Sequence, residues 1–249
     1  MKKLFADATL FIGDISKWDV SRVATMSNMF NSATSFNSDI SRWDVSQVNR
    51  MDFMFWQAKS FNQLLCHSSW VNSKASKTEM FTGSGGEVCT TTFASTGPLK
   101  RAVAVCLKLS PKGDCTRSRH GPIGEWDVSG VTDMFKTFID ASSFNGDISK
   151  WDMSRVTTMA AMFMGASSFN GDISKWHMSS LTTLADTFSR AACFNGDISK
   201  WNVSKVVTIG NIFYGATSFN GDMSKWDVST VLTMAASFKG ATSFNGDIS

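Results

Sequence analysis

The sequence contains little tyrosine, no long apolar run and little net charge, and each shortage narrows what the protein can be. A single Tyr stands against 20 Phe and 9 Trp, which indicates that a few aromatic positions were copied many times. No apolar run approaches the roughly 20 residues of a transmembrane helix, so we expect no membrane span. The net charge of +3 is too small to imply a nucleic acid or an acidic membrane as partner.

What the sequence does contain is a repeat of 25 residues, which reads approximately M-F-x-x-A-T-S-F-N-G-D-I-S-K-W-D-V-S-x-V-T-x-M-x-x. Tryptophans mark the period at Trp18, Trp43, Trp126, Trp151, Trp176, Trp201 and Trp226. One ladder of phenylalanines follows it at Phe5, Phe30, Phe55, Phe138, Phe163, Phe188, Phe213 and Phe238. A second ladder follows it at Phe11, Phe36, Phe61, Phe144, Phe169, Phe194, Phe219 and Phe244. Such self-similarity is typical of stacked repeat proteins.

Two local patterns divide each unit. The first, at residues 147–153, spaces its apolar residues like a short strand. The second, at residues 154–163, places apolar residues on one helical face at Val156, Met159, Met162 and Phe163. Ser154 stands where an N-cap is expected and Gly165 where a C′ glycine is expected. The pattern predicts a short strand followed by a capped helix of about ten residues.

Neither predicted piece can bury its apolar face alone, so we expect the units to stack and to form rows of like side chains. Asparagine recurs once per unit and can bond the backbone of the next coil. It stands at Asn37, Asn62, Asn145, Asn170, Asn195, Asn220 and Asn245. An aspartate row beside it is typical of turns rather than of a cation site. Its members are Asp14, Asp39, Asp147, Asp172, Asp197, Asp222 and Asp247.

The phrase F-N-G-D-I-S-K-W-D-V-S-x-V-T-x-M resembles the repeat of the BspA-like leucine-rich-repeat surface proteins, over the whole chain except residues 64–121. The resemblance implies an α/β fold, a leucine-rich-repeat-like solenoid of 25-residue strand–helix units. It also implies exposure on a cell surface or secretion, with roles in adhesion and protein–protein contact. It carries over no catalytic residues.

One irregular insertion interrupts the repeats, which divides the chain into residues 1–63, 64–121 and 122–249. Joining Gln63 to Pro122 restores the usual spacing from Phe to Trp. The insertion holds four of the five cysteines, and eight Lys or Arg against three Asp or Glu. Three interpretations stay open: a gene-model artefact such as a translated intron, a real surface loop, or an old repeat that has decayed.

No catalytic, cofactor or metal site is expected. The insertion's cysteines, Cys66, Cys89, Cys106 and Cys115, include no C-x₂₋₄-C pair, so zinc is disfavoured, while a disulfide or two would fit a secreted protein. The second acidic row varies between units, and we take it as a candidate recognition row. It consists of Asp19, Asp44, Asp127, Asp152, His177, Asn202 and Asp227.

These observations predict a non-enzymatic repeat protein that binds a protein or glycan partner and uses no cofactor. The alternative is a structural spacer or self-assembling wall element, for which self-association is expected. We expect no signal peptide within these first residues, because Met1, Leu4 and Phe5 fall 25 residues before Met26, Met29 and Phe30 and so belong to a repeat.

Overall fold

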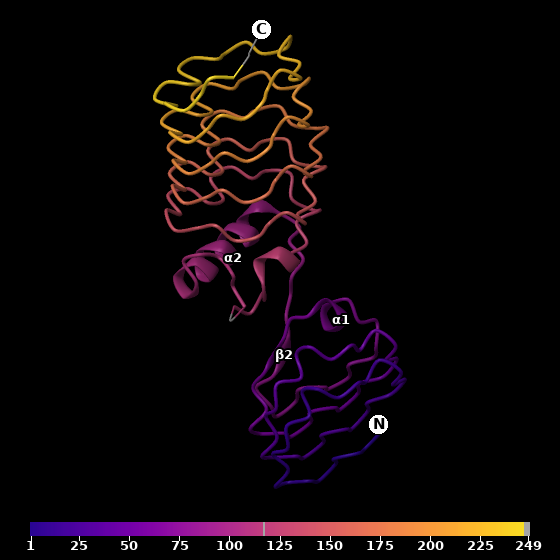
Figure 1. The fold of residues 1–249 in the computed structure, drawn as a ribbon. Helices are drawn as coiled ribbons and strands as arrows, with labels where there is room; N and C mark the ends of the chain where they lie inside the picture. Colours follow the sequence, from indigo (N-terminus) through magenta and orange to yellow (C-terminus); the bar gives the residue numbers. More distant parts are fainter. Residues whose placement is uncertain (117, 247–249) are drawn as a thin grey trace. The chain divides into compact units, whose positions relative to one another are not determined.

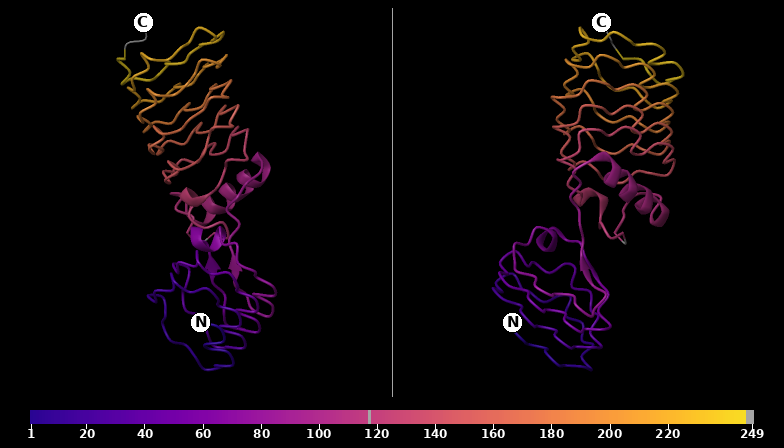
Figure 2. Two further views of the ribbon diagram at one scale, coloured as in Figure 1. Left: turned by 90° about the vertical axis from the view of Figure 1, so that its right-hand side faces the viewer. Right: turned by 180° about the vertical axis from the view of Figure 1, so that it is seen from behind.

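The computed structural model describes residues 1–116 and 118–246 and shows two compact units. Unit 1 contains Met1–Thr91 and Arg119–Gly121, and unit 2 contains Thr92–Ser118 and Pro122–Ser249. In each unit the chain winds through successive coils that lie one upon another (Figures 1 and 2). The insertion is shared between the two units.

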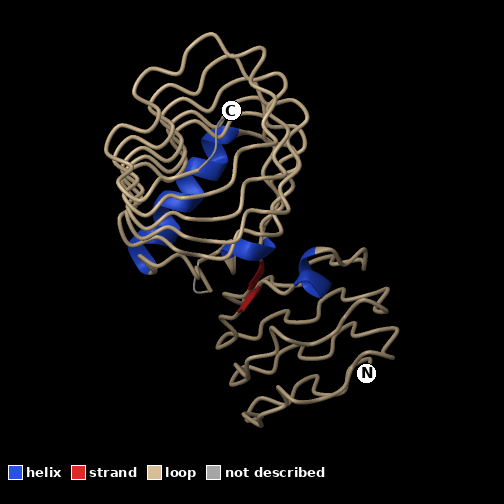
Figure 3. Ribbon diagram, turned by 45° about the horizontal axis from the view of Figure 1, so that its top comes forward, coloured by secondary structure: helices blue, strands red, loops and turns tan. Residues whose placement is uncertain are grey.

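Regular secondary structure is sparse and lies in the insertion and at its junction. In chain order the elements are β1 (Leu64–Leu65), α1 (Ser68–Val71), β2 (Glu87–Val88), α2 (Thr96–Leu109) and the 3-10 helix η1 (Ile123–Glu125). Strands β1 and β2 pair in parallel, with Leu64 opposite Glu87. Figure 3 shows the repeats as loops and turns.

The predicted α/β fold, a leucine-rich-repeat-like solenoid of strand–helix units, is therefore wrong. Within residues 1–116 and 118–246 the 25-residue repeats contain, apart from the single 3-10 turn η1, neither a helix nor a strand longer than an isolated bridge. Ser154, expected to cap a helix, lies in a turn, where its N–H donates to Asp152 Oδ1 at 3.0 Å.

The backbone shows why no helix forms. Ala161 and Gly165 adopt left-handed conformations, with φ of 53° and 73°, which a right-handed helix cannot contain. The N–H groups of Ala161 and Gly165 donate to carbonyls of the next coil, on Ala185 at 2.9 Å and Ser189 at 2.8 Å. Along this stretch the chain makes four-residue turns, in which an N–H donates to the C=O three residues earlier, as Met162 N–H does to Met159 C=O. A series of such turns buries every third residue and imitates a helical pattern.

Isolated parallel bridges tie the coils of unit 2 together. They join Asp133, Thr158, Thr183, Thr208 and Thr233 in succession. Both aromatic ladders are confirmed, since Phe163 stacks on Phe188 at 5.6 Å between ring centroids and Phe169 on Phe194 at 6.0 Å. The indoles of the buried repeat tryptophans Trp43, Trp151, Trp176, Trp201 and Trp226 also donate across a coil boundary, as Trp176 does to Ile148 C=O at 3.2 Å. Burial of these rings is the main favourable term in the stability of the stack.

The first half of the insertion forms a further coil of unit 1. Phe81 continues the phenylalanine ladder at 5.5 Å from Phe55, and Arg50 bridges Ser76 in parallel. Trp70 is fully buried and its indole donates to Ile40 C=O at 3.3 Å, in the manner of a repeat tryptophan. These contacts favour the interpretation of residues 64–91 as a decayed repeat.

The second half of the insertion covers the first coil of unit 2. The inner face of α2 is formed by Leu99, Ala102, Val103 and Cys106. All four are buried in one core with Trp126 and Val128 of the adjoining coil. A helix laid over the first coil shields aromatic side chains that would otherwise face water, as a capping element does.

Candidate functional site

The candidate recognition row lies on the surface, because all seven of its residues are exposed. Six of them use a side-chain oxygen to accept the N–H of the residue two positions later, as Asp19 does from Ser21 at 3.0 Å. His177 has no such oxygen. Serine hydroxyl and backbone hydrogen bonds together lower the pKa of Asp152 and Asp227 below the usual value. The oxygens of this row are thus engaged in their own turns.

The repeated aspartate and asparagine rows are structural. Aspartates such as Asp147 and Asp172 accept the N–H of the serine two residues on at 3.0 Å, while Asp247 lies outside the described residues. The predicted asparagine ladder is confirmed: Asn145 Oδ1 accepts the N–H of Asn170 at 2.9 Å, and the same bond recurs along both stacks.

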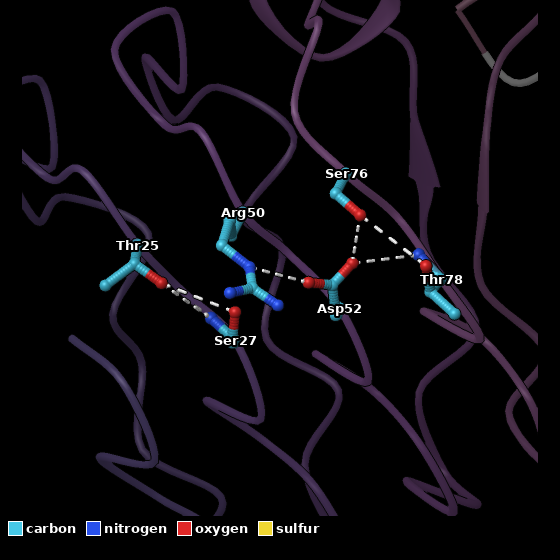
Figure 4. Close-up of polar contacts among 6 residues, drawn as sticks. All are labelled: Thr25, Ser27, Arg50, Asp52, Ser76 and Thr78. Atoms are coloured by element: carbon cyan, nitrogen blue, oxygen red, sulfur yellow. Dashed lines mark hydrogen bonds and ion pairs between the residues drawn. The ribbon is translucent and has the colours of Figure 1, made fainter.

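A polar cluster in unit 1 surrounds one buried carboxylate. Figure 4 shows Asp52 between Arg50 on one side and Ser76 and Thr78 on the other. Arg50 Nε lies 3.0 Å from Asp52 Oδ2, the Thr78 N–H donates to Oδ1 at 3.1 Å, and the Ser76 hydroxyl also donates to Oδ1. The Ser76 hydroxyl, with help from Arg50 and Thr78, lowers the pKa of Asp52. A carboxylate with three partners from its own and the neighbouring coil acts as a clamp between coils.

A hollow of 250 Å³ opens on the turn surface of unit 2. It spans three successive coils and is lined by Met164, Asp186, Ser189, Arg190, Asn211 and Tyr214. Met164, Ser189 and Tyr214 occupy the same position in three successive coils. Because serine is much smaller than methionine or tyrosine, a gap remains between the two large side chains. Gly165 and Gly215 occupy the position of Arg190 in the two adjoining coils.

The functional side chains of this hollow are uncommitted within the protein. Among the described residues, Asp186, Arg190 and Asn211 make no side-chain hydrogen bond or ion pair. Tyr214 is half-buried, and Lys239 Nζ lies 6.0 Å from its ring centroid. The hollow therefore presents a cation, a carboxylate, an amide and a phenol ring to solvent.

The backbone at Arg190 has the conformation that this position adopts throughout the repeats. Arg190 has φ of 58°, and Gly165, Gly215 and Gly240 occupy the equivalent position in other coils with φ of 66–80°. Non-glycine residues hold it elsewhere with φ of 55–59°, at Asp7, Ser32, Gln57 and Asp140. The left-handed turn is thus a regular feature of the coil, and Arg190 is distinguished by its exposed side chain, which has no polar contact among the described residues.

Sequence reasoning missed this hollow, although a signal was present. Its residues occupy positions that differ from coil to coil, and one of them is the chain's single tyrosine. The row through Ser189 reads Ile139, Met164, Ser189, Tyr214 and Lys239. Because residues 154–163 were assigned to a helix, the rows of this turn were not aligned.

The insertion's cysteines form two disulfides, Cys66–Cys89 and Cys106–Cys115, and Cys193 is free and exposed. His67 Nδ1 pairs with the Ser69 hydroxyl at 3.0 Å, and His120 Nδ1 with Thr90 C=O at 2.6 Å. Across residues 1–116 and 118–246, no three His, Cys, Asp or Glu side chains are grouped so that they could hold a metal ion. None of the helices in this part of the chain is long and apolar enough to cross a membrane.

Comparison with known proteins gives one family. The model of the family described as "Mycoplasma protein of unknown function, DUF285" matches residues 1–88, 113–212 and 182–249. No curated protein and no solved structure matches the chain. The matched ranges include the coils of both units, and the stretch between residues 88 and 113 contains α2.

Proposed function

The chain belongs to the DUF285 family of Mycoplasma proteins of unknown function, and we propose that it is a non-enzymatic binding protein that presents the coil surface of unit 2 to a protein or glycan partner. The observation that carries this proposal is Arg190, an exposed side chain with no polar partner among the described residues, in a hollow where neighbouring coils differ. A guanidinium that the fold does not use can donate its hydrogen bonds to a ligand.

The other polar rows support a binding role rather than a catalytic one. The repeated Asp and Asn oxygens, such as those of Asp147 and Asn145, are occupied by N–H groups of their own turn or of the next coil. Side chains used in this way build the scaffold. The varied residues of one surface then provide recognition, as in other stacked repeat proteins.

The two disulfides and the resemblance of the repeat phrase to BspA-like surface proteins support a location on the cell surface or in the secreted fraction. Disulfides persist in oxidising surroundings and are rare in the cytosol. A partner at a cell surface would be a protein or a glycan.

Beads coated with the purified full chain test the proposal by their retention on cultured cells. We expect Arg190→Ala/Tyr214→Ala to lose most of the retention. The matched control, Arg155→Ala/Phe135→Ala, removes one exposed arginine and one exposed aromatic ring from outside the hollow and should retain it. Equal retention of all three proteins would refute the hollow as the binding site, and retention no greater than that of uncoated beads would refute the binding function.

A second candidate is a self-assembling structural element. Like side chains and parallel bridges repeat from coil to coil, as Phe188 shows by stacking on both Phe163 and Phe213. Coils of two copies would pair by the same contacts. Light scattering over a hundredfold dilution tests it: a mass that falls on dilution supports assembly, and a constant monomer mass contradicts it.

A further inference from the structure

We infer that the hollow of unit 2 binds one unit of a saccharide, with Tyr214 against the apolar face of the sugar ring and Arg190, Asp186 and Asn211 on its hydroxyl or carboxylate groups. This inference rests on the proposed binding function and names its ligand class. If the ligand were instead a protein segment, the proposed function would stand and the inference would fail.

The size of the hollow favours a small ring. Its volume of 250 Å³ lies just below the range of about 300–1,000 Å³ that is usual for drug-sized ligands. Ser189 is buried, and it lines the hollow together with Met164 and Tyr214 of the adjoining coils. A site of this volume admits one ring and leaves the rest of a longer ligand in solvent.

The polar groups around the hollow match a polyhydroxyl ligand. Arg190 can only donate, ionised Asp186 can only accept, and Asn211, Ser189 and Tyr214 can do both. Each sugar hydroxyl both donates and accepts, so adjacent hydroxyls can pair with mixed neighbours of this kind. The flat Tyr214 ring supplies an apolar surface beside a polar phenol oxygen.

The backbone argues against an extended peptide as the ligand. Peptide recognition by strand addition needs free N–H and C=O groups at an edge. Here Gly165 N–H donates to Ser189 C=O at 2.8 Å, Arg190 N–H to Tyr214 C=O at 2.6 Å, and Gly215 N–H to Lys239 C=O at 2.8 Å. Since the coils use these backbone groups themselves, recognition depends on side chains.

Charge indicates which saccharides to compare. Arg190 lies at the hollow and Lys239 lies over the Tyr214 ring, against the single carboxylate of Asp186. A guanidinium can hold a carboxylate with two parallel hydrogen bonds. We therefore expect a sugar acid to bind more tightly than its neutral counterpart.

The test is saturation-transfer NMR on the full chain with free glucose, N-acetylglucosamine, glucuronic acid and N-acetylneuraminic acid as probes. We expect transfer to at least one probe, a sugar acid before a neutral sugar, and at least a tenfold loss of affinity in Arg190→Gly and in Tyr214→Ala. Arg155→Ala/Phe135→Ala should bind as the unaltered protein does. Circular dichroism checks that each variant is folded, and Arg190→Gly secures the test if Tyr214→Ala fails to fold.

Two results would overturn the inference. One is the absence of transfer to all four probes; the other is transfer of equal strength in the hollow variants. The same four sugars can be added to the bead assay as competitors. If they do not reduce bead retention, and retention still depends on Arg190 and Tyr214, the ligand is a protein, and only the saccharide assignment is lost.

Discussion

Replacing Arg190 by glycine should make unit 2 more stable and, at the same time, should abolish binding at the hollow. Arg190 holds φ at 58°, while Gly165 and Gly215 hold the same position in the adjoining coils. The substitution therefore gives this coil the residue that both adjoining coils carry, although other coils hold the same conformation with Asp7, Ser32, Gln57 and Asp140. The arginine side chain has no hydrogen bond or ion pair to lose within the described part of the protein.

The size of the effect follows from two opposing backbone terms. A left-handed conformation costs a non-glycine residue about 1–2 kcal/mol. Glycine also gives the unfolded chain more conformational freedom than arginine does. This lowers the stability by about 0.4–1 kcal/mol and offsets part of the gain. The free energy of unfolding should thus rise by about 0.5–1 kcal/mol in Arg190→Gly.

The assay is guanidinium unfolding followed by tryptophan fluorescence and far-ultraviolet circular dichroism. The matched control is Gly215→Ala, at φ of 66°, where the nearest atom to the new Cβ is Arg190 Cγ at 3.7 Å. Because that contact is ordinary, the control should lose about 1 kcal/mol through its backbone alone. A lower unfolding midpoint in Arg190→Gly would show that the arginine stabilises the fold, and would refute the reasoning that reserves it for a ligand.

Three further predictions concern the scaffold. Phe188→Ala should cost about 3–5 kcal/mol in guanidinium unfolding, because its buried ring lies 5.6 Å from Phe163 and 5.8 Å from Phe213; a cost below about 1 kcal/mol would contradict the ladder's role. The turn aspartates, such as Asp152 and Asp227, have lowered pKa values in the folded protein. Their contribution to the free energy of unfolding is therefore fully present above the unfolded pKa of about 4 and is lost as the pH falls through the folded-state pKa values. The unfolding midpoint should drop between pH 5 and pH 2, and less so in Asp152→Asn, which keeps the oxygen acceptor; equal pH dependence in both proteins would contradict this. Loss of the Cys66–Cys89 disulfide, which joins residues 23 apart, should cost about 3 kcal/mol, and a midpoint unchanged by Cys66→Ser/Cys89→Ser would contradict the link.

Much of the core could be predicted from the sequence, because stacking places every repeated residue against its own copies. The Phe163 and Phe169 ladders and the Asn145–Asn170 bond follow from the period alone. A chain with identical units has few other ways to bury identical rings. The period therefore determined the rows without any knowledge of the backbone path.

The backbone path itself could not be predicted in this way. Apolar residues at Val156, Met159, Met162 and Phe163 satisfy both a helix and a series of four-residue turns that repeat every three residues and include left-handed residues. The choice depends on whether backbone N–H groups bond within the coil or to the next coil. That decision is made by long-range stacking, which a local pattern does not record.

Helix α2 was missed for the opposite reason. Leu99, Ala102, Val103 and Cys106 have the spacing of a helical face, but the low regularity of the surrounding insertion concealed it. The hollow was missed because it depends on differences between coils at positions such as Ser189 and Tyr214. These positions can be recognised as one site only when the residues of this turn are aligned between successive coils.

The bonds between coils also determine how an array of this kind can change in length. Residues 25 apart are equivalent, as the bridges from Thr158 to Thr183 and from Thr183 to Thr208 show. Duplication or loss of one complete unit would leave each remaining coil with the same neighbours, whereas gain of one or two residues would displace every ring behind it. In the last coil of unit 1 the bridge joins Arg50 to Ser76, which are 26 residues apart instead of 25. The extra residue is tolerated there because no regular repeat follows within that unit. Genes for such stacks are thus free to recombine in steps of 75 nucleotides, three for each of the 25 residues, and each step would add or remove one set of surface side chains on an unchanged core.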